Sequence, residues 1–358
     1  MSRSVAPLFT PFTINGLELP NRVVMAPMTR SQSPDGIPTA EVAAYYRRRA
    51  ENETGLIITE GTTVNDPVST MDPKVPNFYG AEALKGWKHV VDEVHSVGGK
   101  IMPQLWHVGM ARNPDKAPFP ELPSAGPSGL VKPGKQVSEP MTKDHVQRVI
   151  DAFGRAAADA REIGFDGVEV HGAHGYLVDQ FFWEGMNERK DEFGGDMIIE
   201  AIRRETGKDY PLILRFSQWK QQDYAVKLAS TPDELGAFLK PLSDAGVDCF
   251  HASTRRFWEP EFEGSTLNLA GWTKKLTGKP VITVGSVSLS GEFIGSFMGE
   301  ASDATGIDDL LERLEAGEFD LVAVGRALLV DPAWARKVHE GRFSDLMPFN
   351  PAALASLS

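Results

Sequence analysis

Short apolar runs alternate with longer amphipathic stretches along nearly the whole chain of 358 residues. The runs are continuously hydrophobic rather than alternating, which indicates strands that are buried on both faces. They predict eight strands, at 23–27, 55–60, 100–106, 167–171, 212–215, 249–252, 281–285 and 321–325.

The stretches between these runs have the spacing of amphipathic helices. The clearest helix is predicted at 143–163, where Thr142 is available as the N-cap. Further helices are predicted at 39–50, 84–97, 231–245, 269–276, 307–316 and 331–341. A shorter helix of about ten residues, or ~15 Å, is expected soon after Asp196.

Strictly alternating strands and helices imply a parallel sheet, and eight such units favour closure into a barrel. An open doubly wound sheet would carry a glycine-rich turn after its first strand, but here that strand runs into Pro27, Met28 and Thr29. We therefore predict a single TIM (β/α)8 barrel over residues 1–358, with additional loops at its carboxyl-terminal face. The largest loop is a Pro- and Gly-rich excursion from Asn113 to Glu139.

Composition narrows the class of protein. The hydrophobic content of 41% and charged content of 24% are ordinary for a globular protein, and the net charge of −12 argues against nucleic-acid or anionic-membrane partners. The single cysteine, Cys249, excludes a disulfide framework and a cysteine-based metal site. Neither a signal peptide nor a membrane-spanning run is recognisable, so we expect a cytoplasmic protein.

In a barrel of this kind the residues that close the strands face one common mouth, where substrates bind. These residues include no pair of catalytic carboxylates, no Ser/His/Asp set and no lysine placed for a Schiff base. Two histidines at the fourth strand could begin a metal site but would need a third ligand, so we predict no metal. The strand-end residues are Pro27, Met28, Thr29, Gly61, Gln104, Trp106, His171, His174, Tyr176, Arg215, Gly285, Ser286, Gly325 and Arg326.

The last two strand ends carry Gly285-Ser286 and Gly325-Arg326, at the usual phosphate-binding corner of a TIM barrel. Glycines let backbone N–H groups approach a phosphate, and a guanidinium can fork onto its oxygens. The alternative is that the glycines only make tight turns and that Arg326 pairs with an acid. With Gln104, Thr29 and Arg215 nearby, the corner indicates a phosphorylated heterocycle with amide edges.

Several motifs in the same order resemble those of the Old Yellow Enzyme family of FMN-dependent ene-reductases, and the resemblance runs from Leu8 through the last predicted helix. It is carried by Asn21-Arg22, Ala26 to Arg30, Thr59 to Thr62, Gln104 to Gly109, His171 to Leu177, Asn187-Glu188-Arg189 to Gly194-Gly195, and Val324-Gly325-Arg326.

The resemblance implies tightly but non-covalently bound FMN, with NAD(P)H as the hydride donor. Pro27, Met28, Thr29, Gly61, Gln104 and Arg215 would hold the flavin ring, and Gly285, Ser286, Gly325 and Arg326 its phosphate. His171 and His174 would bind the oxygen of an α,β-unsaturated carbonyl or nitro compound, Tyr176 would donate the proton, and Trp106 would wall the substrate pocket.

Several points remain open from the sequence. Reduction of nitro esters or nitroaromatics, a catalytically impaired ligand-binding barrel, and a non-flavin phosphate-sugar enzyme are alternatives. Tyr176 could simply pack, Gln104 could bond to backbone, and Arg215 could pair with Glu169. The family has a longer segment after Gly194-Gly195, so we expect a deletion near 195–200. The protein is expected to be a monomer or homodimer acting on small molecules.

Overall fold

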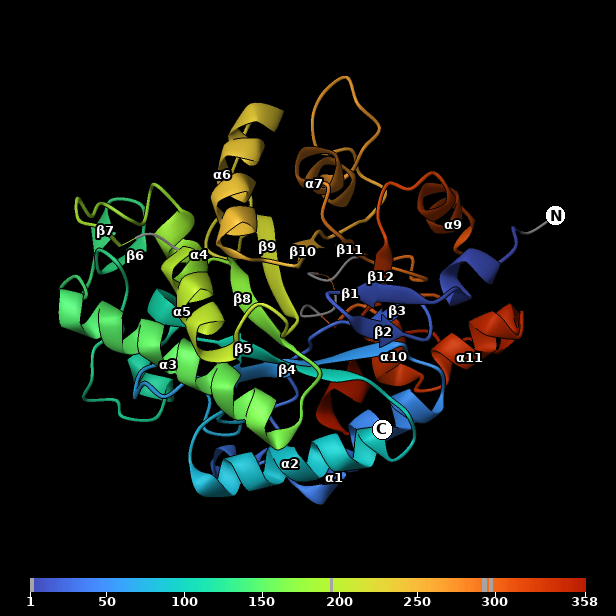
Figure 1. The fold of residues 1–358 in the computed structure, drawn as a ribbon, viewed down its shortest axis with the longest axis horizontal. Helices are drawn as coiled ribbons and strands as arrows, with labels where there is room; N and C mark the ends of the chain where they lie inside the picture. Colours follow the sequence, from blue (N-terminus) through green and yellow to red (C-terminus); the bar gives the residue numbers. More distant parts are fainter. Residues whose placement is uncertain (1–2, 194–195, 292–294, 296–298) are drawn as a thin grey trace.

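The computed structural model describes residues 3–193, 196–291, 295 and 299–358. Its centre is a closed barrel of eight parallel strands, with helices around the outside (Figure 1). Going round the barrel, the order is β10-β11-β12-β3-β4-β5-β8-β9, with β10 pairing β9 to close the ring. The predicted (β/α)8 barrel is therefore confirmed.

The barrel strands coincide with the eight apolar runs of the sequence. They are β3 (Val23–Met25), β4 (Leu56–Thr63), β5 (Ile101–Trp106), β8 (Val168–His174), β9 (Leu212–Lys220), β10 (Cys249–Ser253), β11 (Val281–Val284) and β12 (Leu321–Val324). Three strands, β4, β8 and β9, continue for three residues or more beyond their predicted ends. The sequence hid these extensions because polar residues such as Gln218 and Lys220 interrupt the hydrophobic pattern, although both are buried.

The helices pack their apolar faces on the outside of the strands. They are α1 (Ala40–Glu51), α2 (Ala81–His95), α3 (Lys143–Ile163), α4 (Leu177–Phe182), α5 (Asp196–Thr206), α6 (Pro232–Ala245), α7 (Leu269–Thr277), α9 (Asp308–Glu315), α10 (Arg326–Val330) and α11 (Trp334–His339). The Thr142 hydroxyl caps α3 by accepting a hydrogen bond from the N–H of His145, as the sequence predicts.

The prediction of one final helix over 331–341 is wrong at its start. Helical structure begins at Arg326, directly after β12, and is interrupted before α11 starts at Trp334. The interruption comes at Asp331, which precedes Pro332 and adopts φ −127° and ψ 90°. A residue before proline is disfavoured in the helical region, which explains the break.

The barrel interior has its own apolar cluster, separate from the layer between strands and helices. Val24, Met102 and Ile282 belong to it, and so does Cys249, which therefore packs inside the barrel. Ile14 and Leu19 join the cluster from an antiparallel hairpin, β1 (Phe12–Ile14) and β2 (Leu17–Leu19). Since they contact residues that begin barrel strands, the hairpin closes the end opposite the mouth.

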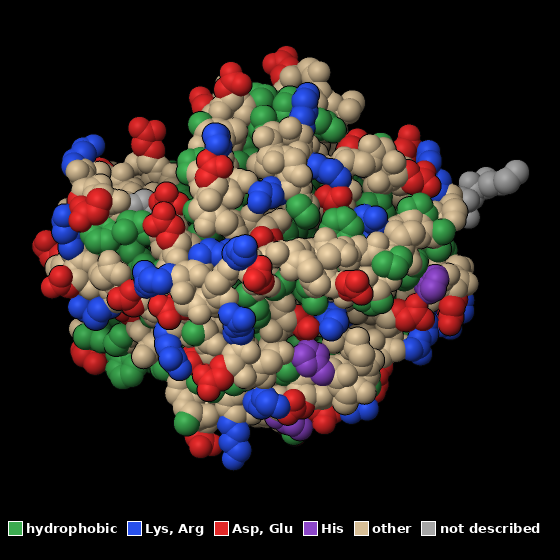
Figure 2. All heavy atoms as spheres, viewed as in Figure 1, with side chains coloured by type: hydrophobic (Ala, Val, Ile, Leu, Met, Phe, Trp, Pro, Cys, Tyr) green, Lys and Arg blue, Asp and Glu red, His purple; other side chains and the backbone are tan. Residues whose placement is uncertain are grey.

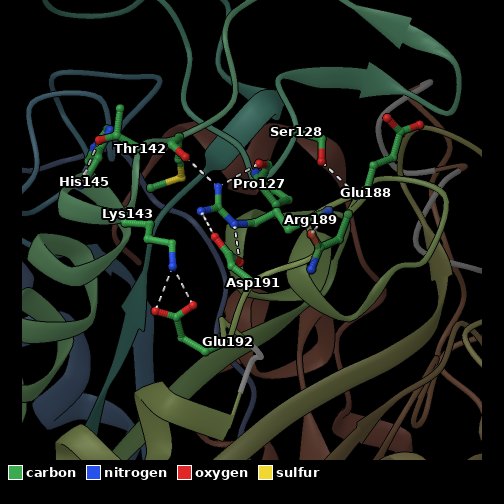
Figure 3. Close-up of polar contacts among 11 residues, drawn as sticks. Pro127, Ser128, Thr142, Lys143, His145, Glu188, Arg189, Asp191 and Glu192 are labelled. Atoms are coloured by element: carbon green, nitrogen blue, oxygen red, sulfur yellow. Dashed lines mark hydrogen bonds and ion pairs between the residues drawn. The ribbon is translucent and has the colours of Figure 1, made fainter.

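The Pro- and Gly-rich excursion is held by an arginine from the segment after α4. Arg189 donates to the carbonyl oxygens of Pro127 at 3.2 Å and Met141 at 2.5 Å, while Asp191 pairs with the same guanidinium (Figure 3). The N–H of Glu188 donates to Ser128 Oγ at 2.8 Å. This part of the Asn187-Glu188-Arg189 motif therefore fastens the excursion, including its hairpin of β6 (Leu130–Lys132) and β7 (Lys135–Gln136), to the barrel.

The remainder of that motif, Gly194-Gly195, lies outside the described residues, as does the start of the expected deletion. Within the described part of the chain, no helix is both long and apolar enough to cross a membrane. Acidic and basic side chains are interspersed over the face viewed in Figure 2.

Candidate active site

A cavity of about 700 Å³ opens at the carboxyl ends of the barrel strands. Every site residue predicted from the sequence lines it, so the structure brings the phosphate corner, the amide-binding residues and the polar rings into one space. These residues are Pro27, Met28, Thr29, Gly61, Gln104, Trp106, His171, His174, Tyr176, Arg215, Gly285, Ser286, Gly325 and Arg326.

The turn that carries His174 and Tyr176 is fixed by a buried ion pair. His174 has φ 66° and Gly175 φ 79°, so this backbone is left-handed. Asp179 Oδ2 accepts the Gly175 N–H at 2.6 Å, and Asp179 Oδ1 lies 2.5 Å from Lys220 Nζ. Both charged side chains are fully buried. The pair therefore ties the turn after β8 to the end of β9.

The imidazole rings of His171 and His174 are uncharged. Burial, and then the positive charge of Arg215, holds the pKa of His171 well below its usual range. Burial, His171 and Arg215 do the same to the pKa of His174. The N–H of Ala173 donates to His171 Nδ1 at 3.4 Å, so the neutral ring of His171 carries its proton on Nε2. The described residues add no third ligand that would complete a metal site.

Ser253 joins His174 to Arg215. Arg215 Nη2 donates to Ser253 Oγ at 3.1 Å, and the same oxygen lies 2.8 Å from His174 Nε2. A guanidinium can only donate, so the Ser253 oxygen accepts from Arg215, and its hydroxyl proton is free to form one of the two arrangements open to this contact, donation to His174 Nε2. With that bond the neutral His174 ring carries its own proton on Nδ1. Each histidine then keeps one N–H donor.

Tyr176 is buried against the other rings of the site. Its ring meets Trp106 edge-on with centroids 4.9 Å apart, and meets His171 edge-on at 5.0 Å. Burial raises the pKa of Tyr176 above its usual value, so the phenol is protonated over the physiological range. Its hydroxyl oxygen accepts a hydrogen bond from Gln221 Nε2 at 2.9 Å.

A buried carboxylate orients Gln104. Gln104 Nε2 donates to Glu169 Oε1 at 2.8 Å, and His251 Nδ1 lies 2.7 Å from the other Glu169 oxygen. Because a carboxylate only accepts, the amide of Gln104 is fixed, and its oxygen is left as an acceptor at the cavity. The alternative that the Gln104 side chain bonds to backbone is not what the described residues show, since its amide nitrogen donates to Glu169.

Arg215 keeps unsatisfied donors in the same region. Its Nε and Nη1 atoms are buried without a hydrogen-bond partner in the described part of the chain. No ion pair with Glu169 forms within the described residues, since that carboxylate is held by Gln104 and His251. Burial lowers the pKa of Arg215 to about 10, so its charge persists at neutral pH. Orphaned donors of a cation suit a ligand edge that carries or develops negative charge.

The phosphate corner is a backbone cradle. Gly285 has φ 142°, and a Cβ there would lie 2.7 Å from Thr254 Oγ1 and 2.9 Å from two backbone nitrogens. Only glycine fits this position. Arg326 Nη2 donates to Ser286 Oγ at 3.2 Å and to the Gly291 carbonyl oxygen at 2.6 Å, which places the guanidinium beside the Gly285-Ser286 turn. Donor chemistry and close backbone approach both fit a phosphate.

Sequence reasoning missed several cavity residues because they lie in irregular segments or beyond the predicted end of a strand. They come from the stretch after β4, the end of β9 and the residues beyond it, and the end of the chain: Met71, Asp72, Val75, Trp219, Gln221, Tyr224, Phe349 and Leu354. Trp219 stacks on His174 with ring centroids 4.4 Å apart, so the missed residues include direct neighbours of the polar rings. In the sequence, the one sign of these residues was Trp219, a tryptophan shortly after a predicted strand.

The Asn113–Glu139 excursion does not reach the cavity. None of its described residues lines the cavity, and neither Arg256 nor Trp258 does, although Arg255 does. The excursion packs beside α4 instead, where Leu130 contacts Trp183 and Met186 in a small apolar cluster.

Known proteins resemble this chain over nearly its whole length. Residues 7–345 match the family described as NADH:flavin oxidoreductase / NADH oxidase. A putative 12-oxophytodienoate reductase 2 of Oryza sativa subsp. japonica is 32% identical over 350 residues, which cover 94% of this chain and 88% of the relative. An NADH oxidase of Thermoanaerobacter brockii is 33% identical over 359 residues, covering 95% of this chain and 52% of that protein.

A solved structure also resembles this chain over nearly its whole length. Morphinone reductase in complex with tetrahydroNAD superposes with a TM-score of 0.80 at 25% identity, covering 97% of this chain and 93% of that one. The barrel, the cavity at its mouth and the match over 7–345 lead to one conclusion: this chain belongs to the Old Yellow Enzyme family of FMN-dependent oxidoreductases that take hydride from NAD(P)H.

Proposed function

We propose that the protein reduces the activated C=C bond of α,β-unsaturated carbonyl or nitro compounds. The observation that carries this proposal is the juxtaposition of two neutral imidazoles and one protonated phenol around a single cavity. Two donors for an oxygen and one proton for a carbon are what the reduction of a polarised alkene needs.

FMN would occupy the cavity along the strand ends that carry glycines and amides. Gly285, Ser286, Gly325 and Arg326 would hold its phosphate. The ring would lie against Pro27, Met28, Thr29, Gly61, Gln104 and Arg215, where the Gln104 oxygen and the orphaned Arg215 donors meet its polar edge. Bound FMN, reduced by NAD(P)H, supplies the hydride that the substrate takes up.

His171 and His174 would bind the oxygen of the substrate through the N–H that each ring retains. As the β-carbon gains hydride, negative charge develops on that oxygen, and two fixed donors in a buried site stabilise it. Their neutrality is useful here because a neutral ring does not give up its proton to the oxygen. Trp106 would form one wall of the substrate site, edge-on to Tyr176.

Tyr176 would protonate the α-carbon. Its phenol holds the proton in the resting site, because burial raises the pKa, and releases it only when the adjacent carbon becomes strongly basic. The hydride brings its own electron pair for the new bond at the β-carbon, and the alkene π pair bonds the proton at the α-carbon. The O–H electron pair stays on Tyr176 Oη, which is left as a phenolate.

The test separates the two halves of the reaction by stopped-flow absorption. Tyr176→Phe is expected to slow reoxidation by 2-cyclohexenone by about 10²–10⁴-fold and to leave flavin reduction by NADPH within a few-fold of wild type. Replacing His171 and His174 together by alanine should weaken binding of phenol-type ligands.

Tyr224→Phe is the matched control, because it removes a hydroxyl from the same cavity without touching the proposed donor. It should not reproduce the selective loss of reoxidation. Equal slowing of both half-reactions by Tyr176→Phe would remove Tyr176 from the role of proton donor, and unchanged phenol affinity would remove the two histidines from oxygen binding.

A further inference from the structure

Gln221 lies directly after β9 and contributes to the cavity wall. Neither the hydrophobic pattern nor the family motifs single it out. Its backbone continues the pairing of β9 with β8, since the Gln221 N–H donates to the His174 carbonyl oxygen at 3.2 Å. The residue is therefore fixed at the turn that carries the two polar rings.

The side chain of Gln221 reaches the hydroxyl of Tyr176. Gln221 Nε2 donates to Tyr176 Oη at 2.9 Å, and no other hydrogen bond to this hydroxyl occurs in the described part of the chain. An amide nitrogen can only donate. The phenol oxygen is thus the acceptor in this bond, and its own proton is not used by it.

We propose that Gln221 is a positioning residue for proton transfer, which accepts no proton itself but holds Tyr176 Oη so that the hydroxyl proton is directed to the substrate. The inference rests on the proposed role of Tyr176 as proton donor. It adds a second residue to that step and assigns its chemistry to one amide N–H.

The same hydrogen bond acts on the charge that the transfer creates. When the proton leaves, negative charge develops on Tyr176 Oη. The Tyr176 residue is almost fully buried, and its ring packs edge-on against Trp106 and His171. A donor fixed at 2.9 Å stabilises that charge more than it stabilises the neutral phenol. Consistent with this, Gln221 lowers the pKa of Tyr176 against the larger effect of burial.

The first experiment is a double-mutant cycle between Gln221→Met and Tyr176→Phe. Gln221→Met is expected to slow reoxidation by 2-cyclohexenone by roughly 10- to 100-fold, the range for one hydrogen bond to a charged group, with little change in flavin reduction by NADPH. In the Tyr176→Phe background the same substitution should have almost no further effect, because its partner atom is gone.

The second experiment is a pH profile of Gln221→Glu. Once ionised, this carboxylate accepts a hydrogen bond from the phenol hydroxyl and so holds the proton away from the substrate. The reoxidation rate should therefore fall as pH rises through the new group's pKa. Below that pKa the protonated acid resembles the amide in shape, and the rate should recover toward wild type. Wild type should show no such step.

A third readout does not depend on turnover. In protein labelled with [¹³Cζ]tyrosine, the resonance that disappears in Tyr176→Phe identifies Tyr176. Its chemical shift should change in Gln221→Met, because the phenol oxygen loses its donor.

Gln222→Met is the matched control. Gln222 is the next residue and bonds to the same turn, through Nε2 to the Gly175 carbonyl oxygen at 2.8 Å, rather than to the phenol. Any effect of Gln222→Met should therefore combine additively with Tyr176→Phe, and it should leave the Tyr176 resonance in place.

Three results would overturn the inference. Gln221→Met that reoxidises at the wild-type rate or faster would mean that the hydroxyl donates to the Gln221 amide oxygen instead. Additivity with Tyr176→Phe would reduce Gln221 to a structural role, as would a Gln221→Glu profile without a new step. The proposed function fails separately, by Tyr176→Phe itself leaving reoxidation unchanged.

Discussion

Two buried carboxylates support opposite parts of the cavity, and they do so by different means. Asp179 accepts the N–H of Gly175 below the polar rings, and Lys220 balances its charge. Glu60 accepts the N–H groups of Arg30, at 2.8 Å, and Ser31, at 3.1 Å, and so fixes the segment that follows Thr29. Each carboxylate therefore holds a backbone turn that presents site residues.

The difference lies in how each charge is satisfied. Asp179 uses one oxygen for the turn and the other for a lysine at 2.5 Å. Glu60 uses one oxygen for both N–H groups, and its Oε1 is buried with no hydrogen-bond partner among the described residues. Burial consequently raises the pKa of Glu60 to about 7. Burial raises the pKa of Asp179 as well, but Lys220 opposes that rise. The turn beside the rings is therefore held by a carboxylate with a counter-ion, whereas the turn beside Thr29 is held by a group that titrates near neutrality.

Breaking the ion pair should have the largest effect. Lys220→Met leaves Asp179 buried without its counter-ion, which we expect to lower the free energy of unfolding by about 3–5 kcal/mol in a urea titration. Adding Asp179→Asn, which keeps an oxygen for Gly175, should restore most of that loss. Lys240→Met is the control, since its partner Asp244 is exposed and the pair is worth less than about 1 kcal/mol. Equal costs for the two lysines would contradict this reading of the pair.

Glu60→Gln should alter the pH dependence of stability. The folded protein keeps the Glu60 proton up to about pH 7, while the unfolded chain releases it near 4.5. The folded state thus binds the proton more tightly. Its contribution is complete below pH 4.5 and is lost as pH rises to 7, by about 3 kcal/mol at most. Glu60→Gln keeps one acceptor oxygen for the two N–H groups of the turn and removes this slope. The prediction fails for a variant whose unfolding free energy falls between pH 5 and pH 8 as steeply as that of wild type.

The smallest effects concern the two turns themselves. Gly175 (φ 79°) and Ser31 (φ 52°) both adopt left-handed backbone. Gly175→Ala should cost about 1–2 kcal/mol, because a side chain is strained there and its Cβ would displace the Gln222 side chain. Ser31→Gly should cost nothing or stabilise by up to about 1 kcal/mol. Thermal unfolding of each variant measures its change in stability relative to wild type. A loss of stability in Ser31→Gly as large as that in Gly175→Ala would refute the role of backbone strain.

The sequence predicts the barrel well and locates two glycines that line the cavity, for physical reasons. Continuous apolar runs can only be doubly buried strands, and Gly285 and Gly325 follow two of them at fixed positions. The phosphate-binding role proposed for them depends on backbone, so position along the chain is sufficient to locate them.

The polar residues in the cavity wall and directly behind it were predicted only in part. His171, His174 and Tyr176 stand out as rings at a strand end, but Gln221 and Lys220 look like solvent-exposed residues in the sequence. Lys220 is buried only because Asp179 lies opposite it, and Gln221 matters only because Tyr176 Oη lies 2.9 Å away. Such pairings depend on how the ends of β8 and β9 meet, which periodicity does not encode.

The central claim is that this flavin-dependent protein reduces an activated alkene, and one anaerobic measurement on the purified holoprotein tests it. The visible spectrum is recorded before and after NADPH, and again after 2-cyclohexenone. The account predicts a yellow protein that bleaches with NADPH and regains its colour with the enone, yielding cyclohexanone. A protein that bleaches and stays colourless after the enone, yet is reoxidised by a nitro compound, would contradict the claim and assign the site to nitro reduction.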